Sequence, residues 1–133
     1  MAIIRTGIDM VEIARLKSQR PAIRARFLQR VFTRHELAEG GDSDALLAGR
    51  FAVKEAVSKA LGSGIGWVRW QDIEVRRGPF GAPELHLYGN AKKLAETLGL
   101  DHWSISITDT DTHAAAVAVA FGLHAQPPPS IEI

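Results

Sequence analysis

The spacing of hydrophobic positions in the first third of the chain predicts one strand followed by helices. Residues 2–9 are rich in isoleucine and predict a first strand. Asp9 then stands where a helical stretch is expected to open. Pro21 suits the first turn of a second helix, and the pair Thr33 and Glu36 matches a capping box that begins a third.

The longest helical pattern covers the middle of the chain. Asp42 or Ser43 is expected to cap it, and it is expected to end near Leu61, with Gly62 as an ordinary C-terminal cap. After this helix the hydrophobic period shortens to two, which is typical of half-buried strands. Four strands and one further helix are expected there, over residues 72–77, 84–88, 90–98 (the helix), 102–109 and 113–121.

The order β-α-α-α-β-β-α-β-β predicts an α+β fold with a mostly antiparallel sheet around a long central helix. A chain of 133 residues fits one domain, which we expect over residues 1–122. Residues 123–133 contain three consecutive prolines and no periodic pattern, so we expect a disordered or loosely docked tail.

Composition excludes several classes of function. The chain has no cysteine, which rules out disulfides, thiolate metal sites and cysteine nucleophiles. Its apolar runs are far shorter than the roughly 20 residues that span a bilayer, and its start lacks a signal-peptide pattern. We therefore expect a cytoplasmic protein without a membrane partner.

Charge is unevenly distributed, although the net charge is only +1. The window from Ile13 to His35 contains no Asp or Glu. Such a window indicates either a surface for an acidic partner or a solvated helical face, and composition does not choose between them. Its basic residues are Arg15, Lys17, Arg20, Arg24, Arg26, Arg30 and Arg34.

The stretch RFAVKEAVSKALGSGIG, residues 50–66, combines charges with small and apolar neighbours. On a helical wheel Glu55 and Lys59 share a side, where they can form an ordinary i,i+4 pair or contact a ligand. Gly62 is explained as a cap, but Gly64 and Gly66 are not. They allow a backbone to approach a ligand closely and to direct amides at it, although the pattern is not a P-loop.

Asp9 also has two interpretations. It can be the N-cap of a helix with Glu12 at the third position. It can also be a metal ligand, because Mg²⁺ takes a few protein oxygens, keeps several waters and shares itself with substrate phosphates. Two carboxylates on separate elements together with a diphosphate would satisfy such an ion.

Three stretches together carry a specific resemblance. They are GIDMVEIARL (7–16), FTRHEL (32–37) and LAGRFAVKEAVSKALGSGIG (47–66). Over roughly residues 3–121 the chain resembles the holo-acyl-carrier-protein synthases, a branch of the 4'-phosphopantetheinyl transferases. The resemblance implies transfer of 4'-phosphopantetheine from coenzyme A to a serine of an apo acyl carrier protein, with release of 3',5'-ADP. It also implies a role in fatty acid biosynthesis and lipid metabolism.

The resemblance assigns roles to individual residues. It implies that Asp9 and Glu55 bind Mg²⁺ and that these two residues and Lys59 are catalytic. It implies a carrier-protein docking surface formed by Arg15, Arg20, Arg24 and Arg26. The residues implied to contact coenzyme A are Arg50, Lys54, Lys59, Gly62, Ser63, Gly64 and Ile65.

One position departs from the family pattern. Ser104 stands where many relatives have a histidine, and Asp109 stands where relatives have His or Asp. His102 lies two residues before Ser104 and would point to the same side of a strand, so it either replaces the histidine or that contact is lost.

Two other functions compete with the transferase. One is a coenzyme A or nucleotide-binding protein without turnover, which the serine at position 104 keeps open. The other is a nucleic-acid-binding module that uses the arginine-rich helices, although the chain is near neutral and lacks a recognised nucleic-acid motif. The family also implies a homotrimer with sites between protomers, and strands rich in Ala and Val at the end of this chain suit such packing.

Overall fold

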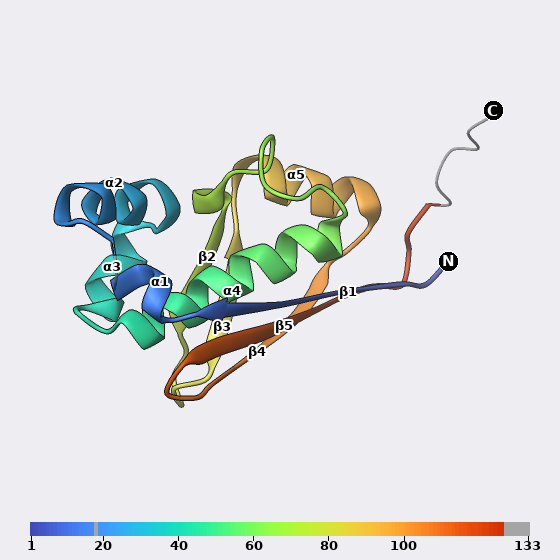
Figure 1. Cartoon of the computed structure of the whole chain (residues 1–133). Coiled ribbons are helices and arrows are strands. Elements are labelled where there is room, and N and C mark those ends of the chain that lie inside the picture. Colours follow the sequence, from blue (N-terminus) through green and yellow to red (C-terminus); the bar gives the residue numbers. More distant parts are fainter. Residues whose placement is uncertain (18, 127–133) are drawn as a thin grey trace.

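A computed structural model describes residues 1–17 and 19–126 of the chain (Figure 1). One long helix, α4, runs through the middle of the molecule, with strands beneath it and shorter helices at both ends. The elements in chain order are β1 (Ile3–Glu12), α1 (Ala14–Lys17), α2 (Pro21–Val31), α3 (Arg34–Gly40), α4 (Asp44–Leu61), the 3₁₀ turn η1 (Trp70–Asp72), β2 (Ile73–Arg77), β3 (Pro83–Leu87), α5 (Gly89–Leu98), β4 (His102–Asp109) and β5 (His113–Gly122).

The larger sheet has the strand order β1-β5-β4, and both pairings are antiparallel. One face of this sheet packs against α4. The contact is made by small side chains, because alanine supplies the buried positions of β5 and much of the facing side of α4. Small residues let a helix and a sheet approach closely, so the carboxylates carried by β1 and by α4 are brought near each other. The alanines are Ala48, Ala52, Ala56, Ala60, Ala114, Ala116, Ala118 and Ala120.

A second sheet contains only β2 and β3, paired antiparallel. The expected antiparallel α+β class is therefore confirmed, and its strands are divided between two sheets. The helical end of the molecule, formed by α1, α2 and α3, lies beyond the first half of α4 (Figure 1). The hydrophobic core lies where α4 meets the larger sheet and β2.

Most helix boundaries follow the expected capping signals. The side chain of Thr33 accepts from the Glu36 amide, and the Glu36 carboxylate accepts from the Thr33 amide, which completes the predicted capping box. Ser43, and not Asp42, caps α4 through a bond from the Leu46 amide. Gly62 ends α4 in the left-handed conformation at φ 78°, as expected for a C-terminal glycine.

The helix expected to open at Asp9 is wrong. Strand β1 continues to Glu12, which pairs with His113 of β5, and Asp9 lies inside this strand opposite Ala116. The alternation of buried and exposed positions persists through Val11, so pairing with β5 overrides the capping signal of Asp9 and Glu12. The only helix before Pro21 in the described residues is the single turn α1.

The described end of the chain returns to the body of the protein. Ala125 is buried, its amide donates to the Met1 carbonyl at 3.0 Å, and its backbone lies against Gly99. Residues 127–133, which hold most of the expected tail, lie outside the described residues. Within the described part of the chain, no helix has the length and apolar character needed to cross a membrane.

Candidate functional site

Glycine at position 7 brings the first strand against the long helix. A Cβ built on Gly7 would lie 1.7 Å from the carbonyl oxygen of Ala56, a separation that no side chain can occupy. Strand β1 therefore crosses α4 with backbone against backbone. Asp9 lies two residues further along the same face of β1, and Glu55 precedes Ala56 on the helix, so this crossing brings the two carboxylates together.

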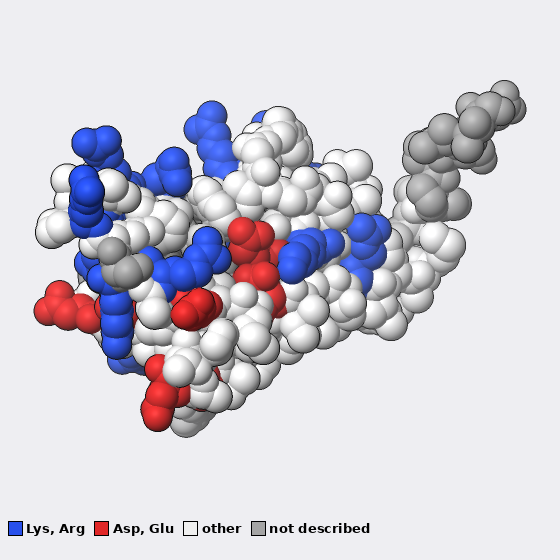
Figure 2. Space-filling view, viewed as in Figure 1, with Lys and Arg blue, Asp and Glu red and all other residues white. Residues whose placement is uncertain are grey.

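The pKa of Glu55 reflects the proximity of Asp9. Burial raises the pKa of Glu55, the charge of Asp9 raises it further, and Lys59 partly opposes both effects. The pKa shift indicates that the two acidic groups repel each other and that one nearby cation does not fully neutralise them. Figure 2 shows acidic side chains gathered over the middle of α4 and β1, with basic side chains on both sides.

Lys59 pairs with Asp9 and not with Glu55, so the i,i+4 pair, one of the two alternatives, is absent. Its ammonium donates to the Ile8 carbonyl at 2.9 Å and lies 3.2 Å from Asp9 Oδ1. The side chain of Lys59 remains half exposed, whereas that of Asp9 is mostly covered. Lys59 thus reaches across to β1, and one face presents two carboxylates with one amine.

The pair of carboxylates is suited to a cation that needs few protein ligands. Among the described residues no group of three His, Cys, Asp or Glu side chains could hold a metal ion. Zinc-type sites with three or four such ligands are therefore absent from this part of the chain. Mg²⁺, which binds through one or two carboxylates and completes its shell with water and phosphate oxygens, matches the donor set of Asp9 and Glu55.

The glycine-rich loop after α4 uses its amides within the chain. The amides of Ser63 and Gly64 both donate to the Ser58 carbonyl at 3.2 Å, and the Gly66 amide donates to the Val68 carbonyl at 2.9 Å. The expectation that this loop directs several free amides at a ligand therefore does not fit the observed bonds. Gly64 adopts φ 62°, a conformation that favours glycine, and a Cβ there would meet only open space.

Lys54 is placed inside the protein. Its side chain is fully buried, and its amine pairs with Glu36 at 2.7 Å and donates to the carbonyls of Trp70 and Ile73. Burial lowers the pKa of Lys54, and the neighbouring Glu36 acts in the opposite direction. An ammonium has three donors, and all three are used here. The phosphate contact expected of Lys54 does not fit this geometry.

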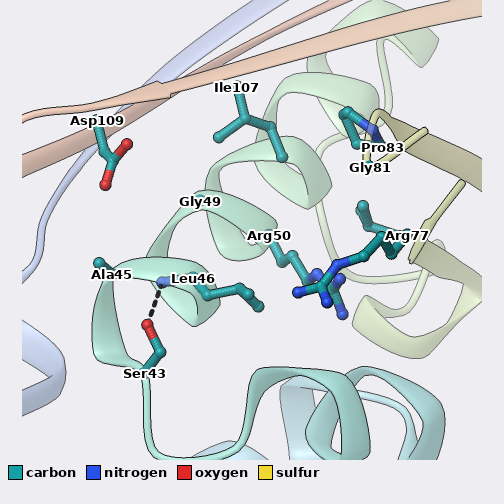
Figure 3. A pocket seen from close by; sticks show the side chains of 11 residues that line it. Ser43, Ala45, Leu46, Gly49, Arg50, Arg77, Gly81, Pro83, Ile107 and Asp109 are labelled. Atoms are coloured by element: carbon teal, nitrogen blue, oxygen red, sulfur yellow. Dashed lines mark hydrogen bonds between the residues drawn. The ribbon is translucent and has the colours of Figure 1, made fainter.

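Arg50 lines a pocket of about 390 Å³ that is open to solvent (Figure 3). Its guanidinium is held at 2.9 Å by Glu39, whose carboxylate also accepts from the Arg77 amide. Figure 3 shows Arg50 and Arg77 on one side of the pocket and Asp109, from β4, on another. The pocket therefore offers an anion the exposed side chain of Arg77, whereas the guanidinium of Arg50 is buried and already paired with Glu39.

The pocket with Arg50 and the pair Asp9–Glu55 lie on different flanks of α4. Arg50 and Glu55 are five positions apart, which separates them by about 140° around a helix axis. Neither Asp9 nor Glu55 lines the pocket. One molecule therefore cannot direct all the residues expected to contact coenzyme A at a single compact site.

The basic window identified in the sequence forms an exposed surface on the helical end of the molecule. Figure 2 shows Lys and Arg side chains gathered over α1 and α2. Arg15, Arg20 and Arg26 are exposed there. Arg24 differs, because its guanidinium is paired with Asp44 of α4 at 2.6 Å and is partly covered.

No described helix covers the outer face of the larger sheet, which is apolar along much of β1 and polar along β4. Ile4, Ile8 and Met10 of β1 are each more than 60% exposed on it. Ser104 and His102 of β4 are exposed on the same face, and the His102 ring lies near that of Phe121. Large apolar side chains in such a row indicate a surface that contacts another protein.

Sequence analysis did not identify three residues that shape this region. Gly7 carries the strand–helix contact, Glu36 neutralises Lys54, and Glu39 orients Arg50. Glu36 was visible only as a capping residue, because partners far apart in the chain leave no spacing signal.

Comparison with known proteins adds independent information. Residues 5–119 match the family model of the 4'-phosphopantetheinyl transferase superfamily. The holo-[acyl-carrier-protein] synthase of Natranaerobius thermophilus is 40% identical over 109 residues, covering 80% of this chain and 87% of the relative. That of Alteromonas mediterranea is 44% identical over 113 residues, covering 82% and 89%.

Solved structures of similar proteins match the fold closely. The Helicobacter pylori holo-[acyl-carrier-protein] synthase in complex with coenzyme A has a TM-score of 0.78 and 34% identity, covering 86% of this chain and 98% of that one. The Bacillus anthracis synthase in complex with CoA (3',5'-ADP) has a TM-score of 0.73 and 32% identity, covering 92% and 100%.

Proposed function

The chain belongs to the 4'-phosphopantetheinyl transferase superfamily, and from this premise we propose that it is a holo-acyl-carrier-protein synthase. In the proposed reaction a serine hydroxyl of an apo acyl carrier protein attacks the β-phosphate of coenzyme A. The new bond joins the serine oxygen to that phosphorus, and the bond from the phosphorus to the bridging oxygen breaks. The leaving group is 3',5'-ADP, and the serine proton passes to water or to a carboxylate of the site.

We assign Asp9 and Glu55 to one Mg²⁺ ion. The observation that carries this assignment is the pair of repelling carboxylates at the crossing of β1 and α4. When bound, the ion would offset charge on the attacked and leaving phosphates. The Lys59 amine, which lies 3.2 Å from Asp9 Oδ1, would add a donor for a phosphate oxygen beside the ion.

The nucleotide is assigned to two surfaces that come from different molecules. Ile65 and the neighbouring glycines follow the helix that carries Glu55 and would supply a small backbone that a ligand can approach closely. Arg50 lies in the pocket on the other flank of α4, beside Arg77. A second protomer that brings its pocket to the first protomer's carboxylates would complete the site.

We propose a homotrimer on these grounds. The exposed row of Ile4, Ile8 and Met10 is too apolar for a face that stays in water. Burying it against a second copy would stabilise the assembly by the hydrophobic effect. With each protomer supplying one surface to a neighbour, a closed ring of three has three equivalent sites.

The basic surface on α1 and α2 is proposed to dock the carrier protein. Exposed guanidinium groups from Arg15, Arg20 and Arg26 would attract an acidic partner and accelerate its encounter. Arg24 contributes mainly by holding α2 against α4 through Asp44. The partners of the protein are then acyl carrier protein and coenzyme A, both expected in the cytoplasm.

One experiment tests the reaction directly. Purified apo acyl carrier protein is incubated with the protein, coenzyme A and Mg²⁺, and its mass is followed. We expect a gain of one phosphopantetheine on the carrier serine and the appearance of 3',5'-ADP. A carrier of unchanged mass, together with measurable coenzyme A binding, would instead support a binding protein without turnover. This is the alternative suggested by the serine at position 104.

A further inference from the structure

Among the ion pairs of the described residues, Lys54–Glu36 is the only one in which both side chains are fully buried, and the proposed reaction does not use it. Moving two charges out of water is costly, and a hydrophobic pair of similar size is often at least as stable. The pair therefore calls for a reason beyond stability.

Every polar group of this pair has a partner. The Lys54 amine contacts Glu36 and the carbonyls of Trp70 and Ile73. Glu36 Oε1 also accepts from the Thr33 amide at 2.9 Å, and Oε2 accepts from the Val75 amide at 3.0 Å. Four elements, α3, α4, η1 and β2, thus meet at one ion pair.

The carbonyl of Trp70 is the informative contact, because it marks the end of the glycine-rich loop. The loop leaves α4 at Gly62, where Ser63 and Gly64 are bonded to Ser58 of the helix. It returns to the same helix at Trp70, whose carbonyl accepts from Lys54 and whose ring stacks on Phe51 with a centroid distance of 5.0 Å. Both ends of the loop are therefore fixed to α4.

The same turn also supports the basic helix. The Gln71 side chain donates to the carbonyls of Gln29 and Phe32, at the end of α2. The turn η1 is thus bonded to α4 through Lys54 and to the end of α2 through Gln71.

We propose that Lys54, held by Glu36, is a positioning residue that fixes the end of the glycine-rich loop to the turn of α4 that also carries Glu55, and thereby supports coenzyme A binding. Glu55 is the next residue on α4. The helix turn that carries this proposed metal ligand therefore also carries Lys54, whose amine binds the end of the loop. A lysine suits this role because one flexible amine satisfies two carbonyls and a carboxylate at once. The effect on coenzyme A binding rests on the proposed function, whereas the fixing of the loop rests on the hydrogen bonds alone.

The test compares Lys54→Met with a control of similar stability loss. Leu100→Ala opens a cavity in a buried position of the core between α5 and β4, away from the loop. Amide hydrogen exchange of each apo protein is followed by mass spectrometry for loop peptides covering 62–69 and for the β4–β5 hairpin. The Michaelis constants for coenzyme A and for carrier protein are measured alongside.

In Lys54→Met we expect loop exchange to rise by about tenfold or more, with the hairpin unchanged. We also expect the KM for coenzyme A to rise by about tenfold, with a much smaller change in kcat. Leu100→Ala should change neither. Equal loop protection and equal KM in Lys54→Met and Leu100→Ala would overturn the proposal.

Lys54→Met leaves Glu36 buried without its partner, which can prevent folding. The paired variant Lys54→Met with Glu36→Leu removes both charges and still lacks the amine that holds Trp70, so the same exchange criterion applies to it. If the wild type itself does not transfer phosphopantetheine, the proposed function fails. Loop exchange in the variants then still decides the positioning role by itself.

Discussion

Gly7 and Ala56 lie in direct backbone contact, with the position of a Gly7 Cβ only 1.7 Å from the Ala56 carbonyl oxygen. This contact is the geometric origin of the candidate site, because it sets how closely β1 can approach α4. Asp9 and Glu55 lie close enough for their charges to interact, and their separation depends on this contact.

Replacing Gly7 by alanine tests this relationship. The added methyl must push β1 away from α4, at a cost of about 1–3 kcal/mol typical of overpacking. Transfer activity should fall further than stability suggests, because Asp9 moves away from Glu55. Urea unfolding and a transfer assay measure both quantities. Thr97→Ala, at an exposed position of α5, is the control, and full activity in Gly7→Ala would contradict this relationship.

Neutralising either carboxylate should remove activity without unfolding the protein. Asp9→Asn and Glu55→Gln each delete a proposed Mg²⁺ ligand and also relieve the repulsion between the two groups. We expect at least about a hundredfold loss of turnover, with a free energy of unfolding in the absence of metal that is equal to or above that of the wild type. Circular dichroism melts and a carrier mass assay measure the two effects. Near-normal turnover at ordinary Mg²⁺ concentration in both variants would refute the ligand assignment.

Glu39 should make stability depend on pH in the acid range. Burial opposes its ionisation, but the Arg77 amide and the Arg50 guanidinium outweigh burial and lower the pKa of Glu39 below its ordinary 4.5. A carboxylate with a lowered folded-state pKa stabilises the protein above its unfolded-state pKa, and this contribution is lost as the pH falls through the folded-state value.

The corresponding variant is Glu39→Gln. At pH 7 we expect it to be less stable than the wild type by about 1 kcal/mol or less, since the pair is partly exposed. This difference should shrink as the pH falls below 4.5 and vanish in stronger acid. Denaturant unfolding at a series of pH values measures it, and a difference that stays constant from pH 7 to pH 3 would show that the charge of Glu39 is not responsible.

A charge on the outer face of the larger sheet should break the proposed assembly. Ile8→Asp places a carboxylate in the middle of the exposed apolar row. We expect sedimentation to change from trimer to monomer, with loss of most transfer activity because the pocket with Arg50 comes from a neighbour. Lys93→Asp, on the exposed surface of α5, is the control and should remain trimeric and active. A fully active monomer would exclude shared sites.

Charge reversal on α2 should affect only the carrier protein. Arg20→Glu and Arg26→Glu should raise the KM for carrier protein severalfold, most strongly at low salt, and leave the KM for coenzyme A unchanged. Lys92→Glu, on α5, is the matched reversal away from this surface. Steady-state kinetics at two ionic strengths separate these effects, and rates in the wild type that do not depend on salt would argue against electrostatic docking.

Much of the fold follows from local signals in the sequence. The capping box of Thr33 and Glu36, the start at Pro21 and the stop at Gly62 are all decided by neighbours within a few residues. The failure at Asp9 has the opposite cause. A local capping pattern there is overridden by pairing with β5, about a hundred residues away in the chain.

The site shows the same division. Asp9, Glu55 and Lys59 could be chosen from the family motif, and the structure brings them to one face. The burial of Lys54 could not be foreseen. A helical wheel shows which side of the helix a residue faces, but it does not show that Glu36, far away in the sequence, packs against that side. The exposed apolar row on β1 likewise could not be recognised from the sequence, because only the fold shows which face of the sheet is left uncovered.

The central claim is that one divalent cation is held jointly by Asp9 and Glu55. Crystals grown with coenzyme A and Mn²⁺ in place of Mg²⁺ test it directly through the anomalous signal of manganese. We expect one peak within coordination distance of a carboxylate oxygen from each residue and of the coenzyme A diphosphate. A cation that contacts neither carboxylate, or a diphosphate bound away from both, would contradict it.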